Sequence, residues 1–117
     1  MIWFLAKVVF HIITPKGQEQ GQFEEVLIIV EARNKVEAFE KAAKRGRSDA
    51  SEFVNSKGDK IHWEFVAVSQ LQLLPEFTDG LMLDSHLEKI GAQEEFINLQ
   101  LEKQRRILEE RQDLLIF

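Results

Sequence analysis

The sequence predicts an α+β domain with a mainly antiparallel four-stranded sheet in the order β-β-α-β-β, one covering helix and a long amphipathic C-terminal helix. Three observations support this class. Runs rich in β-branched and aromatic residues are separated by turn residues. A segment with the spacing of an amphipathic helix lies between two of these runs, and a second helical pattern, without proline or glycine, follows Gly91. A chain of 117 residues, 44% of them hydrophobic, suffices for one core. We therefore expect one domain over 1–90 and a helical appendage over 91–117.

The first two strands are predicted to form a hairpin. Residues 2–13 are apolar except for Lys7 and His11, and alternation leaves one face fully apolar. That face consists of Phe4, Ala6, Val8, Phe10 and Ile12. The segment TPKGQEQGQ at 14–22 has turn composition, and the apolar run at 23–32 supplies the second strand.

A helix is predicted to start at Asn34 or Lys35. Asn34 is a good N-cap residue, and Glu37 stands three residues later, as in a capping box. Apolar residues at helical spacing should face the sheet, namely Val36, Phe39, Ala42 and Ala43. Gly46 is a candidate for the end of this helix, and the alternative is that the polar segment after it continues the helix for one or two further turns.

Two further strands are predicted after the helix. The turn at 57–59 leads into a long strand at 61–74, which Pro75 ends. Asp79 and Gly80 form a favoured tight-turn pair, and the alternating residues 81–87 are predicted as the fourth strand.

The C-terminal helix carries an apolar seam with partial heptad spacing. This seam either packs on the sheet of its own chain or binds a partner helix. In the second case the protein partner is another protein or a second copy, which would make a homodimer. The predicted interface consists of Ile97, Leu101, Leu108, Leu115 and Phe117.

No motif for phosphate binding, zinc-protease chemistry or nucleophilic catalysis is present, and the chain has no cysteine. We expect a protein that is not an enzyme and uses no cofactor. One set of side chains has the chemistry of metal ligands, with two-residue steps that would put them on sheet faces. It comprises His62, Glu64, Asp84, His86 and Glu88. The competing interpretation is the polar side of a half-solvated sheet.

Positive charge gathers near the end of the first helix, at Lys41, Lys44, Arg45 and Arg47. These residues are a candidate anion-binding group, with a solvated helix end as the alternative. The net charge of −5 opposes nonspecific nucleic-acid binding. No apolar run approaches the roughly 20 residues that cross a bilayer, and we expect a cytoplasmic protein.

The segment from Trp3 to about Leu87 resembles an uncharacterised family of small bacterial domains. The resemblance rests on the opening strand with Trp3, the segment EARNKVEAFEKAAKRG, the strand WEFVAV at 63–68 and Asp79-Gly80. It implies a shared fold and no particular activity.

The sequence thus favours a noncatalytic protein–protein interaction module, for which self-association through the C-terminal helix is one mode of binding. One alternative is an immunity or antitoxin-like inhibitor of a basic partner, because small acidic domains can cover a basic site. The other is a metal- or small-ligand-binding protein that uses the His and carboxylate face.

Overall fold

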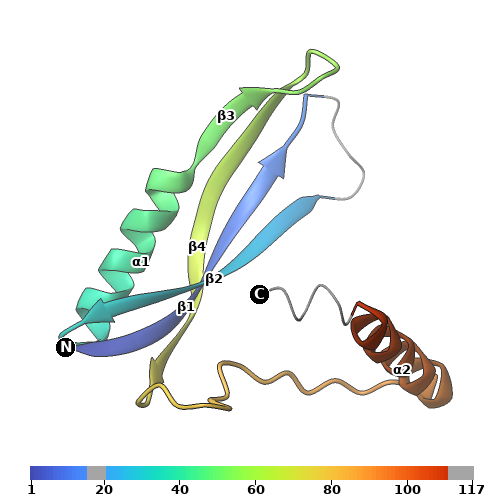
Figure 1. Cartoon of the computed structure of the whole chain (residues 1–117). Helices are drawn as coiled ribbons and strands as arrows, with labels where there is room; N and C mark the ends of the chain where they lie inside the picture. Colours follow the sequence, from blue (N-terminus) through green and yellow to red (C-terminus); the bar gives the residue numbers. More distant parts are fainter. Residues whose placement is uncertain (16–20, 111–117) are drawn as a thin grey trace. The chain divides into compact units, whose positions relative to one another are not determined.

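The computed structural model describes residues 1–15 and 21–110. The chain divides into two compact units, Met1–Leu83 and Asp84–Phe117. The elements are β1 (Ile2–Ile13), β2 (Gln22–Ala32), α1 (Lys35–Asp49), β3 (Ser51–Val54), β4 (Lys60–Leu74) and α2 (Gln93–Glu109) (Figure 1). The predicted α+β class, with a four-stranded antiparallel sheet and a C-terminal helix, is confirmed.

The sheet is built around β1. The strand order is β2-β1-β4-β3, and every neighbouring pair is antiparallel. β1 pairs with β2 along nearly its whole length and with β4 from Trp3 opposite Leu74 to Ile13 opposite His62. The predicted apolar face of β1 is the one that α1 covers, since Phe4, Ala6, Val8 and Phe10 are all buried.

The fourth strand is not where the sequence predicted it. Residues 81–87 form no strand, and the sheet is completed instead by β3, which precedes β4. A tight turn explains the pairing of β3 with β4: the Asn55 N–H donates to the Asp59 carbonyl at 2.9 Å, and Gly58 adopts a φ of 81°. Apolar and polar residues alternate at 81–87 as they do in a strand, but a strand also needs a neighbouring strand with which to pair.

α1 begins where the sequence predicted and ends later. Asn34 is its N-cap, and the Asn34 side-chain oxygen accepts a hydrogen bond from the Glu37 N–H at 2.9 Å. Gly46 does not end the helix, because α1 continues to Asp49, which agrees with the alternative of a helix that extends past Gly46. A Cβ atom at Gly46 would lie 2.5 Å from the Phe65 ring and 2.9 Å from Val8. Gly46 therefore permits close contact between α1 and the sheet.

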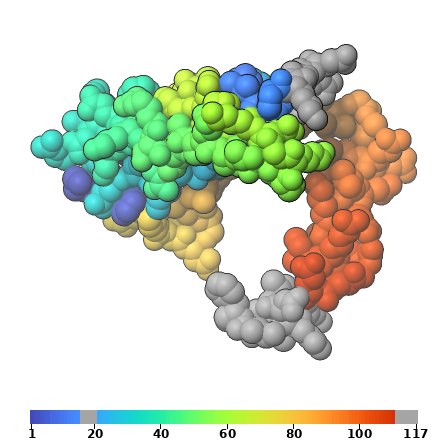
Figure 2. Space-filling model, turned by 90° about the horizontal axis from the view of Figure 1, so that it is seen from above, coloured from blue at the N-terminus to red at the C-terminus, as the bar shows by residue number. Residues whose placement is uncertain are grey.

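Small side chains hold α1 against the strands. Ala38, Ala42 and Ala43 are buried together with Gly46, and they face the apolar side of β1 and β4. Figure 2 shows the resulting continuous packing of α1 and the strands, drawn from blue to yellow-green. The core of this unit is thus a single helix lying closely on one face of the sheet.

Candidate interaction surfaces

The predicted seam of the C-terminal helix is a stripe of exposed apolar side chains on α2. Ile97, Leu101 and Leu108 are 56%, 55% and 54% exposed, and no residue of α2 is buried within its own unit. At 100° per residue these three side chains share one side of the helix. Phe96 and Ile107 are also exposed, and they lie about 80–140° around the helix from these three residues. The two other predicted interface residues, Leu115 and Phe117, lie outside the described residues.

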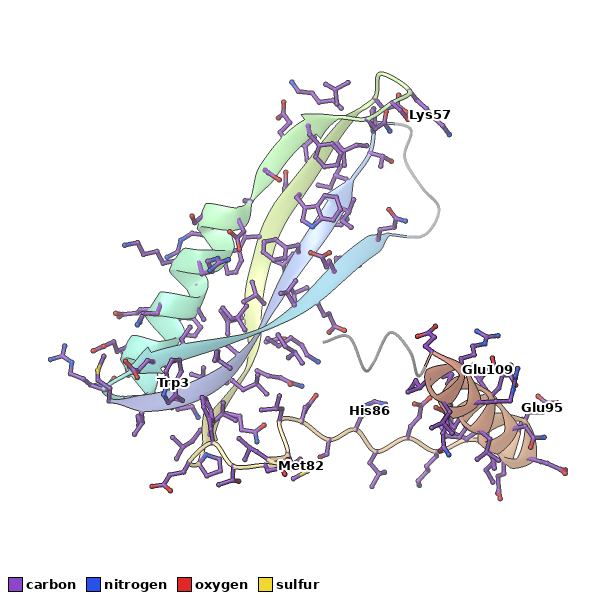
Figure 3. All side chains as sticks on the ribbon, viewed as in Figure 1. Trp3, Lys57, Met82, His86, Glu95 and Glu109 are labelled. Atoms are coloured by element: carbon purple, nitrogen blue, oxygen red, sulfur yellow. The ribbon has the colours of Figure 1, made fainter. Side chains whose placement is uncertain are left out.

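Ion pairs occupy one flank of the stripe and the side of α2 beyond it. Arg105 bridges Glu102 and Glu109, and the Arg106 Nε lies 3.5 Å from a Glu102 oxygen. The hydrogen bond from Arg105 lowers the pKa of Glu102 below its ordinary value of 4.5. Figure 3 places Glu95 and Glu109 toward the two ends of the helix. Glu102 and Arg106 identify the side of α2 that prefers water, whereas Arg105, about 40° from Leu101 around the helix axis, borders the stripe.

The first half of the predicted metal-ligand set lies on β4. His62 and Glu64 occupy the same face of this strand, and Glu64 is directly opposite His11 of β1. However, the His62 Nδ1 atom lies 3.2 Å from a carboxylate oxygen of Glu52, and the Lys60 ammonium lies 2.8 Å from the other oxygen. The hydrogen bond from Lys60 lowers the pKa of Glu52. His62 thus contacts the Glu52 carboxylate that also pairs with Lys60 in the β3–β4 hairpin.

The second half of that set does not lie on a strand. Asp84, His86 and Glu88 belong to the extended segment before α2, where Figure 3 labels His86. The His86 Nε2 atom lies 3.2 Å from a Glu88 oxygen. Across residues 1–15 and 21–110, no three His, Asp or Glu side chains gather as a metal site requires. The strand face that motivated the prediction is therefore absent for these three residues.

Most of the predicted anion-binding group contacts its own domain. The Lys41 ammonium donates to the Glu31 carbonyl of β2, and the Arg45 guanidinium lies 2.8 Å from Asp49. The Arg47 guanidinium lies 5.9 Å from the centre of the Phe65 ring. Lys44 is exposed on the same helix. Three of the four side chains thus help to attach or stabilise α1.

Sequence reasoning missed a groove between α1 and β4. It has a volume of about 450 Å³ and is lined by Lys35, Val36, Phe39, Val68, Ser69, Gln70 and Leu71. Val36 and Phe39 were predicted to face the sheet core, yet they are 68% and 49% exposed. Ser69 is an extra residue on β4, because Lys7 pairs with Gln70 and Val8 pairs with Val68. The groove therefore lies beside a bulge.

The groove runs along an incompletely paired edge of the sheet. β3 covers only Lys60 to Trp63, so in the described unit Met1–Leu83 the rest of β4 has a strand on one side only. Residues 66–74 of this edge contain no charged residue, whereas the opposite edge strand, β2, carries Glu24, Glu25 and Glu31. Charges commonly protect edge strands from pairing. The absence of charge at 66–74 is the sequence signal that could have drawn attention to this surface.

In the part of the chain that the structure describes, no helix has the length and apolar character needed to span a membrane. The observations define a small α+β sheet domain with one covering helix, joined to an amphipathic helix, and its prominent surface features are an apolar stripe and a groove beside a sheet edge.

The chain belongs to the family described as a domain of unknown function, DUF4288, whose model matches residues 3–83. The predicted resemblance to an uncharacterised family is thereby confirmed. No curated protein and no solved structure matches the chain. The matched region covers the sheet and α1, and α2 lies beyond it.

Proposed function

We propose that the protein is a noncatalytic protein–protein interaction module that assembles with a second copy through its C-terminal helix. The observation that carries this proposal is the apolar stripe of α2, which its own unit leaves uncovered. Fully burying one Leu, Ile or Phe side chain contributes roughly 1.5–3 kcal/mol. The stripe contains several such side chains, so covering it is strongly favourable.

The arrangement of charge on α2 supports an ordered partner contact. Glu102 and Arg106 lie away from the stripe and Arg105 borders it, so the apolar side can be covered while most of these charges stay in water. The stripe repeats over Ile97, Leu101 and Leu108, which is the spacing that a partner helix recognises. A pair of such helices would bury both stripes at once.

Fewer observations support the two alternative functions. Inhibition of a basic partner is supported by the net charge of −5 and by an acidic second half, in which residues 58–117 contain twelve acidic and six basic side chains. Metal or small-ligand binding is supported by His62 and Glu64 alone, and His62 already pairs with Glu52. The described residues add no observation that favours either alternative over the interaction module.

The test compares two lysine substitutions on the same helix in the full chain. Leu101 lies in the stripe, whereas Leu99 is similarly exposed, at 52%, and lies about 160° away around the helix axis. We expect the unmodified chain to be a dimer or larger by light scattering. Leu101→Lys should lower the solution mass to that of the monomer at micromolar concentration, and Leu99→Lys should leave the mass unchanged.

Two results would contradict the proposal. In the first, the unmodified chain is monomeric and Leu101→Lys lowers the free energy of unfolding of the whole chain more than Leu99→Lys does, which would assign the stripe to the core of its own molecule. In the second, both variants assemble like the unmodified chain. Circular dichroism should show equal helix content in the two variants, so that the comparison reports on contact and not on loss of the helix.

A further inference from the structure

The unpaired part of β4 and the groove beside it combine two features of a peptide-binding surface. Within the unit Met1–Leu83, the backbone of β4 beyond Trp63 has hydrogen-bonding groups that no second strand covers. The groove runs next to this backbone between β4 and the N-terminal turns of α1. An extended peptide that pairs with a sheet edge gains affinity from main-chain hydrogen bonds and specificity from pockets for its alternate side chains.

The lining of the groove indicates which side chains such a peptide would carry. Val36 and Phe39 of α1 face Val68 and Leu71 of β4 across it, so the side chains that enter it should be apolar. Successive residues of a strand point to opposite faces, so every second residue of the peptide would enter the groove. The volume of about 450 Å³ is enough for a few such side chains.

The charge of the groove adds a further requirement. Of the described residues that line it, Lys35 alone is charged, and Lys35 is exposed. A carboxylate on the peptide would complement this ammonium group. A second copy of β4 would not, because residues 66–74 contain no acidic side chain and a two-fold pairing would add a second Lys35. The charge therefore favours a different polypeptide segment over a copy of this strand.

We propose that the edge of β4 binds an extended segment of a partner protein, with apolar side chains at alternate positions and an acidic residue next to Lys35. This proposal goes beyond the proposed function, because it gives the interaction module a second contact, with a different protein, that does not require assembly through α2. The segment pairs with the backbone of β4, and its apolar side chains pack between Phe39 and Leu71.

The first experiment uses labelled seven-residue peptides with alternating Val and Thr and a Glu at the first or the last position. Binding to the full chain is followed by fluorescence anisotropy and by the amide signals of β4. We expect at least one of these peptides to bind at micromolar to millimolar concentration and to shift the signals of residues 68–72. Methylation of two central peptide nitrogens removes two donors and should weaken binding about tenfold or more.

The second experiment reverses one charge in the chain. Lys35→Glu should weaken binding of the Glu peptide about two- to fivefold and should strengthen binding of a matched Lys peptide. The control is Lys57→Glu, because Lys57 lies at the β3–β4 turn (Figure 3) and does not line the groove. Lys57→Glu should change neither affinity.

Three results would overturn the proposal: no peptide of the panel binds, N-methylation has no effect, or Lys35→Glu and Lys57→Glu behave alike. A fall in solution mass on Gln72→Lys would also overturn it, because the edge would then pair with a second copy. The Leu101→Lys chain should still bind the peptide. Failure of peptide binding therefore leaves assembly through α2 intact, and failure of assembly leaves the peptide result intact.

Discussion

α1 and α2 have similar lengths and are both amphipathic, yet they use their apolar sides differently. α1 buries small residues, namely Ala38, Ala42, Ala43 and Gly46, against the sheet. α2 presents large ones, including Ile97, Leu101 and Leu108, and buries none of them within its own unit. Small residues let a helix lie close to a sheet, and large ones form a stripe that needs a partner surface. Helical spacing alone does not distinguish the two situations.

The largest expected effect on stability comes from adding a side chain where α1 lies closest to the sheet. Gly46→Ala should lower the free energy of unfolding by about 1–3 kcal/mol, because the added carbon would lie 2.5 Å from the Phe65 ring. Ala is favoured over Gly inside a helix by about 1 kcal/mol, and the steric cost should exceed this gain, so that the net effect is destabilising. Urea unfolding of the full chain measures this change in the free energy of unfolding.

The matched control is Gly91→Ala, where a Cβ atom would meet nothing within 4 Å. We expect its effect to stay within about 0.5 kcal/mol. Equal unfolding midpoints for the two variants would show that close contact does not decide how α1 is held.

A smaller effect is expected from removing the N-cap side chain of α1 and from adding an N-cap side chain to α2. Asn34 caps α1, so Asn34→Ala should cost about 1 kcal/mol of stability, whereas the N-cap of α2, Ala92, makes no side-chain hydrogen bond. Ala92→Ser would create a capping box with Glu95 and should slow amide exchange in the first turn of α2 about twofold or more. Unchanged exchange in α2 would show that its start is not limited by the missing cap.

The smallest expected effect is the pH dependence of α2. The hydrogen bond from Arg105 lowers the pKa of Glu102, so the ion pairs stabilise the helix above the ordinary value of 4.5. Their contribution is lost as the pH falls through the lower pKa of the folded helix. The protection of the amides in residues 102–109, taken relative to their intrinsic exchange rate at each pH, should therefore fall below about pH 4.5.

Two controls accompany this titration. Glu102→Gln should flatten the pH profile, and 1 M salt should weaken it because exposed charges are screened within about 3 Å. If the pH profile is the same with and without the Glu102 carboxylate, these ion pairs do not determine the stability of α2.

Much of the fold could be predicted because its signals are local. The alternation in residues 2–13, the cap at Asn34 and the helical pattern after Gly91 each report on neighbouring residues, and each prediction is confirmed. The errors concern features that need a partner. Residues 81–87 alternate like a strand but pair with nothing in the described sheet, while the short segment Ser51–Val54 pairs because a turn brings it to β4.

The candidate surfaces were predicted unevenly for the same reason. The stripe at Ile97, Leu101 and Leu108 follows from helical periodicity, and the structure leaves it uncovered within its unit. The groove depends on where β3 stops and on the bulge at Ser69. Neither is visible in the pattern of a single segment, and the pattern assigned Val36 and Phe39 to the core.

The sequence by itself determined the class of the fold, the start of α1, the face of β1 that is buried and the apolar side of α2. Periodicity and capping are enough for these features, because they depend on residues within a few positions of one another. Only the tertiary structure decided the strand order, the role of Gly46 and the open edge of β4. Each of these depends on which distant segments meet and how closely their backbones approach.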